Sequence, residues 1–190
     1  YEEILASKHG RLLWNRDLAG SLWEERPERS AEPVYILDEK YAGKSRGEKL
    51  SELRRYMEKK GGDRVLLSSL EDIAWLMNLR GSDVSHTPVF LAFALIEQDT
   101  VQLYADNRAF SEAVTEALAG DGIILKPYME IYEDLKKLSE GKLMYDSEKV
   151  NYALCQCVPK TVSVLPADIH EMIPKAVKNE VELDNLRRGH

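Results

Sequence analysis

The sequence is poor in cysteine and has no long apolar run. Its two cysteines, Cys155 and Cys157, stand too close together to join distant elements, and their spacing is neither that of a redox pair nor that of half a zinc site. Nothing in the sequence resembles a secretory leader. The longest apolar run, residues 88 to 96, has the length of a strand, whereas a membrane helix needs about 20 residues. We therefore expect a cytoplasmic protein with no membrane span.

The sequence also has fewer basic than acidic residues. The chain holds 26 Lys and Arg residues against 33 Asp and Glu residues, which gives a net charge of -7. Binding to a phosphate backbone needs clustered basic side chains that release counterions, so we expect no nucleic-acid partner. With 190 residues, of which 44% are hydrophobic, the chain can bury a substantial core. We expect one folded domain with an appended arm.

Motifs for metal binding and nucleophilic catalysis are missing. The stretch that begins at His170 starts like the HExxH zinc helix, but Pro174 stands where the second histidine is needed. The other histidines, His9, His86 and His190, have no cysteine or carboxylate at ligand spacing. No serine lies in a G-x-S-x-G motif. The sequence therefore predicts no catalytic residue and no metal ligand in this chain.

The first 43 residues differ from the rest of the chain. Pro27 and Pro33 interrupt short apolar groups that include Trp14 and Trp23. Because proline removes a backbone donor and biases its predecessor toward extended conformations, we interpret residues 1 to 43 as a linker or arm. Its tryptophans are expected to dock on another surface. The folded domain is predicted over residues 44 to 176.

Helices and strands are expected to alternate in that domain. Ser45-x-x-Glu48 forms a capping box ahead of the first helix, which Gly61 ends, and Ser68-x-x-Glu71 is expected to cap the second. The phosphate-loop reading of Gly43-Lys44-Ser45 fails, because Asp38 stands where that motif needs its first glycine. Strands are expected at residues 64 to 68, 88 to 96, 100 to 105, 122 to 126, 142 to 145 and 161 to 165.

The remaining helices are expected at residues 108 to 119, at 130 to 138, from a cap at Asp146 through about Cys155, and from about Asn179 onward. A connection of hairpin length, residues 97 to 99, predicts an antiparallel pair. Alternating elements with one hairpin indicate an α/β fold of three layers, a mixed β-sheet flanked by helices.

One polar turn, residues 79 to 88, lies between a helix and a core strand. Gly81 can supply a positive φ, Asp83 can accept backbone donors, and Arg80 can pair with a carboxylate or a carbonyl. Two interpretations stay open. The turn satisfies its own polar groups, or it is a surface that faces a substrate or another domain.

Three separated strings resemble the Xaa-Pro aminopeptidase (aminopeptidase P) family of the creatinase and prolidase superfamily, the M24 metallopeptidases: residues 37 to 45, residues 71 to 91, and residues 173 to 180 with 186 to 190. They occur in the family's order. Residues 36 to 190 resemble the second domain of a three-domain member. Residues 1 to 35 resemble the end of the preceding domain and its connection, and residues 177 to 190 the start of the link into the catalytic domain.

The resemblance implies a creatinase N-terminal fold, related to ribonuclease H-like domains, and a parent protein that removes an amino-terminal residue preceding proline. The family holds two divalent metal ions, such as manganese, with two aspartates, one histidine and two glutamates of a following pita-bread domain. No position in this sequence matches those ligands. We therefore expect a segment of a longer protein that carries no cofactor and is inactive alone.

The expected partners are the catalytic pita-bread domain of the same parent chain, short proline-containing peptides reached through the parent, and a second copy in a homodimer. Amino-terminal domains of the family lie near the opening of the active site. Arg80, Asp83 and His86 are thus candidates for a substrate-opening or interdomain surface, with Trp75, Asn78, Gly81 and Pro88 as structural candidates. The alternative function is a metal-free creatinase-fold module that binds peptides or proteins.

Overall fold

A computed structural model describes residues 2 to 10 and 12 to 189. Tyr1, Arg11 and His190 lie outside the described residues. The expectation that His190 is not a metal ligand therefore concerns a residue outside that range. The centre of the molecule is a six-stranded sheet in the order β6-β5-β4-β2-β7-β8. Its strands are β2 (Arg64–Leu67), β4 (Ala92–Glu97), β5 (Val101–Ala105), β6 (Ile123–Pro127), β7 (Gly141–Tyr145) and β8 (Val162–Pro166).

The sheet is mixed. Strand β4 pairs antiparallel with both β2 and β5, and the register that places Ile96 opposite Val101 confirms the predicted hairpin. The pairs β5 with β6, β2 with β7 and β7 with β8 are parallel. Parallel strands need crossover connections, which the intervening helices supply.

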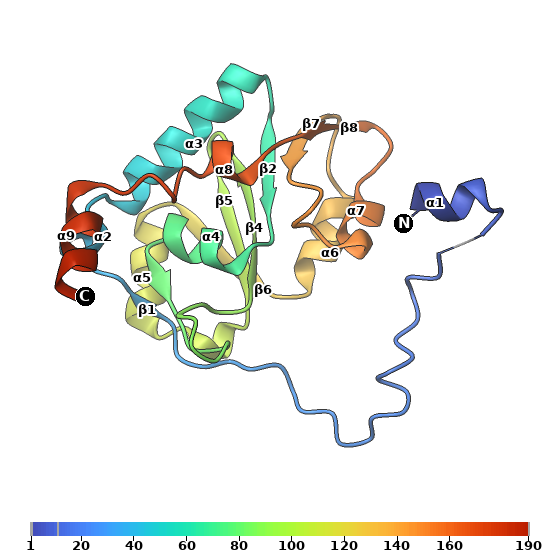
Figure 1. Cartoon of the computed structure of the whole chain (residues 1–190), viewed down its shortest axis with the longest axis horizontal. Helices are drawn as coiled ribbons and strands as arrows, with labels where there is room; N and C mark the ends of the chain where they lie inside the picture. Colours follow the sequence, from blue (N-terminus) through green and yellow to red (C-terminus); the bar gives the residue numbers. More distant parts are fainter. Residues whose placement is uncertain (1, 11, 190) are drawn as a thin grey trace.

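Both faces of the sheet are buried, because side chains of one strand point alternately to its two faces. In β2, Val65 and Leu67 join one core cluster and Leu66 joins the other. Helices α3 (Arg46–Lys60), α4 (Leu70–Leu76), α5 (Glu112–Gly120) and α8 (Ile169–Met172) cover the first face, and α6 (Glu130–Lys136) and α7 (Tyr152–Cys157) cover the second (Figure 1). The predicted three-layer α/β fold is confirmed.

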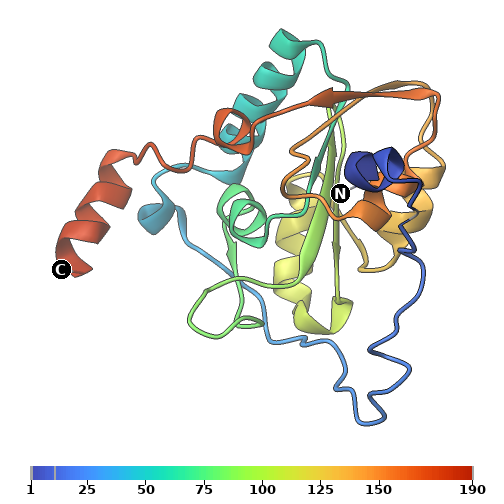
Figure 2. The ribbon, with the colours of Figure 1, turned by 45° about the vertical axis from the view of Figure 1, so that its right-hand side comes forward.

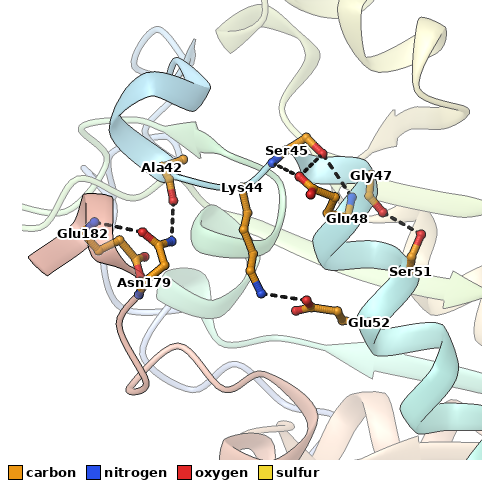
Figure 3. A network of polar contacts seen from close by, with 9 residues as sticks. All are labelled: Ala42, Lys44, Ser45, Gly47, Glu48, Ser51, Glu52, Asn179 and Glu182. Atoms are coloured by element: carbon orange, nitrogen blue, oxygen red, sulfur yellow. Dashed lines mark hydrogen bonds and ion pairs between the residues drawn. The ribbon is translucent and has the colours of Figure 1, made fainter.

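The ends of α3 are as predicted. The Ser45 side chain accepts from the backbone N–H of Glu48, and the Glu48 carboxylate accepts from the Ser45 N–H at 2.8 Å, which completes the capping box (Figure 3). Gly61 ends the helix with a φ of 71°. Asp38 instead caps the short helix α2 (Glu39–Ala42) by accepting from the Lys40 N–H.

Two expected caps are wrong. Helix α4 follows Ser69, and the Ser68 hydroxyl is turned away to donate to the carbonyl of Lys149 at 2.7 Å. Helix α7 is capped by Asn151, because the Asp146 carboxylate is committed to backbone donors elsewhere, including the Ile169 N–H. In both cases a contact with a segment distant in sequence takes the polar side chain away from the expected helix.

The helix expected at residues 108 to 119 is divided. A 3-10 turn, η1 (Asn107–Ala109), is held by the Asp106 side chain, and α5 begins only after Ser111, which accepts from the Val114 N–H. Two capping side chains five positions apart therefore start two separate elements. The strand expected from residue 88 begins only at Ala92, because the preceding backbone bonds within the loop rather than to a neighbouring strand.

The first residues form α1 (Glu2–Ser7) and an extended segment that runs around the domain (Figure 1). Trp14 makes an edge contact with the ring of Tyr152 on α7, with centroids 6.2 Å apart, whereas Trp23 is half exposed. Within the segment called the arm, β1 (Tyr35–Ile36) pairs with β3 (Leu79–Arg80). The domain limits at residues 43 and 176 stay predictions.

The final helix, α9 (Glu180–Gly189), begins where the sequence predicted and lies beside α2. Figures 1 and 2 both show α9 projecting from the side of the molecule that also carries α2 and α4. In the part of the chain that the structure describes, no helix has both the length and the apolar character needed to cross a bilayer.

Candidate functional site

A groove of about 570 Å³ lies between α4, α9 and the loop that follows β3. Its walls include apolar side chains of Leu37, Trp75, Val89 and Leu186. Its charged groups come from four places in the chain: Glu71, Arg80, Lys175 with Lys178, and Glu182. The groove thus joins the first helical layer, the polar turn and the last helix.

Three of the predicted site residues line this groove: Trp75, Arg80 and Pro88. Gly81 and His86 line a neighbouring hollow of about 370 Å³, which shares Thr87 and Pro88 with the groove. The structure therefore brings the predicted turn to one edge of the groove.

Asp83 lines neither hollow and holds the turn together. Its carboxylate accepts from the backbone N–H groups of Glu32 at 3.0 Å and Leu91 at 2.8 Å. The expectation that Asp83 accepts backbone donors is confirmed. These bonds fix the ends of the loop to each other and to the arm, so the loop surface is presented in a defined shape.

The positive φ expected at Gly81 is wrong. Positive φ values in this region belong to Asn78, at 49°, and to His86, at 63°. Gly81 is required for a different reason: a Cβ atom there would lie 2.8 Å from the Cβ of Phe90. The close approach of two backbone segments, and not the turn conformation, demands glycine.

Arg80 is half-buried at the groove and its Nη1 donates to the carbonyls of Ala74 and Leu79, each at 2.8 Å. The expected pairing is therefore with carbonyls. Among the described residues no carboxylate forms an ion pair with Arg80, and its Nε and Nη2 groups have no hydrogen-bond acceptor. Partial burial of the guanidinium lowers the pKa of Arg80, while Tyr35 and Glu182 act in the opposite direction.

Sequence reasoning missed Lys49, a cation beneath the groove that is only 2% exposed. Its Nζ donates to Asn78 Oδ1 at 2.6 Å and to the Trp75 carbonyl at 2.8 Å, and lies 4.0 Å from the centre of the Trp75 ring. Burial lowers the pKa of Lys49 to about 8, although the charge of Glu182 acts in the opposite direction and raises it. The signal was present, because Lys49 stands four positions before Leu53 on the apolar face of α3.

Asn78 and Trp75, which accept hydrogen bonds from Lys49, also donate hydrogen bonds to neighbouring segments of the chain. The amide of Asn78 donates to the Lys44 carbonyl at 2.9 Å, so one buried side chain joins α3 to the end of α4. The Trp75 indole N–H donates to Glu182 of α9 at 2.8 Å. Trp75 lines the groove, whereas Asn78 is buried outside its lining, and the structural role of both stays an interpretation of these contacts.

Helix α9 is attached to the domain by polar contacts. Asn179 accepts from the Glu182 N–H and donates to the Ala42 carbonyl, both at 2.9 Å (Figure 3), and Asn185 donates to the Tyr41 carbonyl at 2.9 Å. No side chain that the structure describes in α9 is buried. The groove wall that α9 forms is therefore held by a few hydrogen bonds, without an apolar core of its own.

The groove offers a cation, hydrogen-bond donors and apolar surface, a combination suited to recognition. Across the described residues, no three or more His, Cys, Asp or Glu side chains are grouped so that they could hold a metal ion. The described side chains therefore form no cluster that fits the pair of metals that the family resemblance implies.

The family model of the creatinase/prolidase N-terminal domain matches residues 25 to 182. A probable Xaa-Pro aminopeptidase P of Sordaria macrospora is 37% identical over 187 residues, which cover 92% of this chain and 30% of that protein. Xaa-Pro aminopeptidase 1 of Dictyostelium discoideum is 36% identical over 169 residues, 88% of this chain and 26% of that protein. The chain thus spans less than a third of the length of these relatives.

Solved structures agree on the fold. The X-prolyl aminopeptidase of Caenorhabditis elegans, described as a cytosolic enzyme with a di-nuclear active site, superimposes with a TM-score of 0.90 at 23% identity. The superposition covers 99% of this chain and 32% of that chain. An Xaa-Pro dipeptidase from Bacillus anthracis gives a TM-score of 0.51 at 17% identity, over 76% of this chain and 39% of that chain. The family model over residues 25 to 182 and the relatives of 36 to 37% identity show that the chain belongs to the creatinase/prolidase N-terminal domain family.

Proposed function

We propose that this chain is a noncatalytic domain of a metal-dependent Xaa-Pro aminopeptidase, and that it shapes access to the active site through the face that carries the groove. The groove is the observation that carries the proposal, because it gathers the turn from Arg80 to Pro88 with an exposed apolar surface. The identity of 36 to 37% with Xaa-Pro aminopeptidases along most of the chain supports the parent activity.

Large apolar side chains stand uncovered on this face. Tyr41 and Leu186 line the groove and are 52% and 50% exposed, and Tyr35 and Val84 line the neighbouring hollow at 53% and 39%. Contiguous exposed apolar surface marks a place where another protein surface packs. The partner that fits the family is the catalytic pita-bread domain of the same parent chain.

The two divalent metal ions, manganese by family resemblance, are assigned in this proposal to that catalytic domain. The description of the Caenorhabditis elegans relative as a cytosolic enzyme with a di-nuclear site supports both the metal pair and a cytoplasmic setting. The metals supply a Lewis acid and an activated water in such enzymes. Short proline-containing peptides are the proposed substrates of the parent.

The test uses a full-length parent with Arg80→Ala and His86→Ala combined. We expect kcat/KM for an Xaa-Pro peptide to fall about ten-fold, because positioning is disturbed from a distance. The matched control combines Arg55→Ala and His170→Ala, two exposed side chains of the same types away from the groove. Unchanged kcat/KM together with unchanged thermal stability in the Arg80 and His86 variant would remove this proposal.

The groove also favours a second candidate, a metal-free creatinase-fold module that binds peptides or proteins. Apolar walls with a few charged groups among them would suit such a ligand as well. The coding sequence of the parent separates the two candidates. Two aspartates, one histidine and two glutamates in a pita-bread domain support the peptidase, and a pita-bread domain without them supports the binding module.

A further inference from the structure

We propose that Arg80 receives an Asp or Glu carboxylate from the catalytic domain of the parent, and that this ion pair anchors the docking of that domain on the groove face. This inference rests on the proposed function and specifies the chemistry of the partner surface. It follows from the breadth of the face, from the distribution of charge on it and from the way α9 is attached.

The hollowed face extends beyond the groove itself. The groove shares Thr87 and Pro88 with the hollow over the loop, and shares Tyr41 and Asn185 with a third hollow of about 450 Å³ between α2 and α9. The three hollows form one continuous surface. Figure 2 shows α2, α4, α9 and the loop after β3 gathered on the same side of the molecule. Such an extended surface suits a folded partner domain.

The charges on this face single out Arg80. Lys175 is paired with Asp72 at 2.7 Å, and Lys178 donates to the Lys175 carbonyl at 2.5 Å. Glu182 accepts from Trp75 and from the backbone of Asn179. In the described part of the chain, Arg80 is the half-buried groove cation that has no ion-pair partner.

Partial burial of an arginine is unfavourable when no carboxylate bonds to it directly. The Arg80 guanidinium loses water, one of its nitrogens donates to two carbonyls, and Glu182 acts on it only through space. A carboxylate can accept two parallel N–H bonds from a guanidinium and offset that cost. Glu71, the other groove carboxylate, is exposed and stays in water. An acidic side chain flanked by apolar residues is thus the partner that the groove fits.

The attachment of α9 supports a protein partner. The helix is held by side-chain hydrogen bonds and buries none of its described side chains, while Leu186 faces the groove half exposed. A docked domain would cover Leu186 and bury more of the apolar surface of α9. The same contact would close the groove around Arg80.

Photo-crosslinking locates the partner. In the full-length parent, p-benzoylphenylalanine replaces Thr87, which lines two of the hollows and leaves Arg80 intact. We expect a crosslink to a segment of the catalytic domain that contains an Asp or Glu. A crosslink to a second copy of the chain, to a catalytic-domain segment without an acidic residue, or to nothing would overturn the inference.

Charge reversal tests the ion pair. In the parent with Arg80→Glu, we expect protease cleavage after α9 to be about ten-fold faster, because the new carboxylate repels the partner carboxylate and the catalytic domain undocks. The cleavage rate of Arg80→Lys should lie between those of the unmodified parent and Arg80→Glu. Arg55→Glu, an exposed site on α3, should leave the rate unchanged. Changing the crosslinked acid to arginine should restore the slow rate in Arg80→Glu.

Equal cleavage rates for Arg80→Glu and the unmodified parent, or no restoration by the second charge change, would contradict the ion pair. Far-UV circular dichroism of the 190-residue chain with Arg80→Glu shows whether that variant folds. If it does not, the crosslink decides, because it leaves Arg80 unchanged. Peptide turnover by the 190-residue chain alone tests the proposed function and does not involve Arg80, so the two failures are distinguishable.

Discussion

Single residues on the groove face are constrained by their surroundings more than by their own conformation. Gly81 has no positive φ, yet a Cβ atom would meet Phe90 and lie 3.1 Å from the Val89 carbonyl oxygen. Asn78 adopts the left-handed conformation, which asparagine tolerates better than most residues. Its side-chain oxygen accepts from Lys49, and its side-chain nitrogen donates to the Lys44 carbonyl. Substitutions at these positions should therefore act through packing and buried polar contacts.

Gly81→Ala should lower the free energy of unfolding by about 1 to 3 kcal/mol, because the new methyl group has to displace the backbone of the next segment. The control is Gly47→Ala in the exposed first turn of α3, where a Cβ would meet nothing within 4 Å. That variant should be neutral or more stable by up to about 1 kcal/mol. Urea unfolding measures both, and equal effects at the two glycines would contradict the packing argument.

Because of Lys49, the free energy of unfolding is expected to depend on pH. Burial lowers its pKa to about 8 from an ordinary value of 10.5, while Glu182 and Glu52 favour its charged form and Arg80 and Lys44 oppose it. Between these two values the unfolded chain holds more protons than the folded chain, so stability rises with pH. Below about pH 8 both states are protonated and the unfavourable contribution is constant.

The expected contribution is a rise in unfolding free energy of up to about 1.4 kcal/mol per pH unit between the two pKa values. Lys49→Met has no titrating group at this position and should lack that contribution. Urea unfolding of both proteins at several pH values from 7 to about 10 measures the difference between their unfolding free energies. The contributions of the other titrating groups are common to both proteins and cancel in this difference. Parallel profiles for the two proteins would show that the buried lysine does not titrate in this range.

At the scale of elements, α9 is the part of the groove that depends on the fewest contacts. Asn179 caps it and ties it to α2, and Glu182 ties it to the Trp75 indole. Without a buried apolar face, the helix should open locally more easily than the helices of the two cores.

Asn179→Ala should raise the hydrogen-exchange rate of the α9 amides about ten-fold, because it removes both the cap and the bond to the Ala42 carbonyl. The matched control is Asn151→Ala, which removes the asparagine cap of α7. That change should leave α9 exchange unaffected. Mass-spectrometric hydrogen exchange reads out both helices, and unchanged α9 exchange in Asn179→Ala would argue for an attachment by other contacts.

The order of strands and helices was predictable because local patterns determine it. The capping box at Ser45 and the hairpin before Val101 depend on neighbours in sequence, and both are confirmed. The caps at Ser68 and Asp146 were wrong because distant backbone groups, Lys149 and Ile169, engage those side chains. Such contacts are set by the tertiary fold and leave no local signal.

The candidate site was predictable only in part. The polar turn drew attention to Arg80, and its neighbours Trp75 and Pro88 also line the groove. The opposite wall comes from α9, and no sequence pattern indicates that Glu182 reaches Trp75 across 107 positions. The proposed role of Arg80, Asp83 and His86 at an opening or interface stays a prediction.

For the whole molecule, the fold places its buried apolar side chains on the two faces of one sheet and leaves a hollowed face at the side of α9. Membership of the creatinase/prolidase N-terminal domain family explains the sheet and its helices. The groove face is where a partner domain has room to contact the chain. We propose that the chain contributes binding surface to a peptidase and performs no peptide hydrolysis itself.

The most direct measurement is turnover of an Xaa-Pro peptide by the 190-residue chain with added manganese, next to a full-length parent under the same conditions. Release of the amino-terminal residue is followed by mass spectrometry. We predict rapid release by the parent and no release above the buffer rate by the chain. Turnover by the chain at the parental rate would contradict the account.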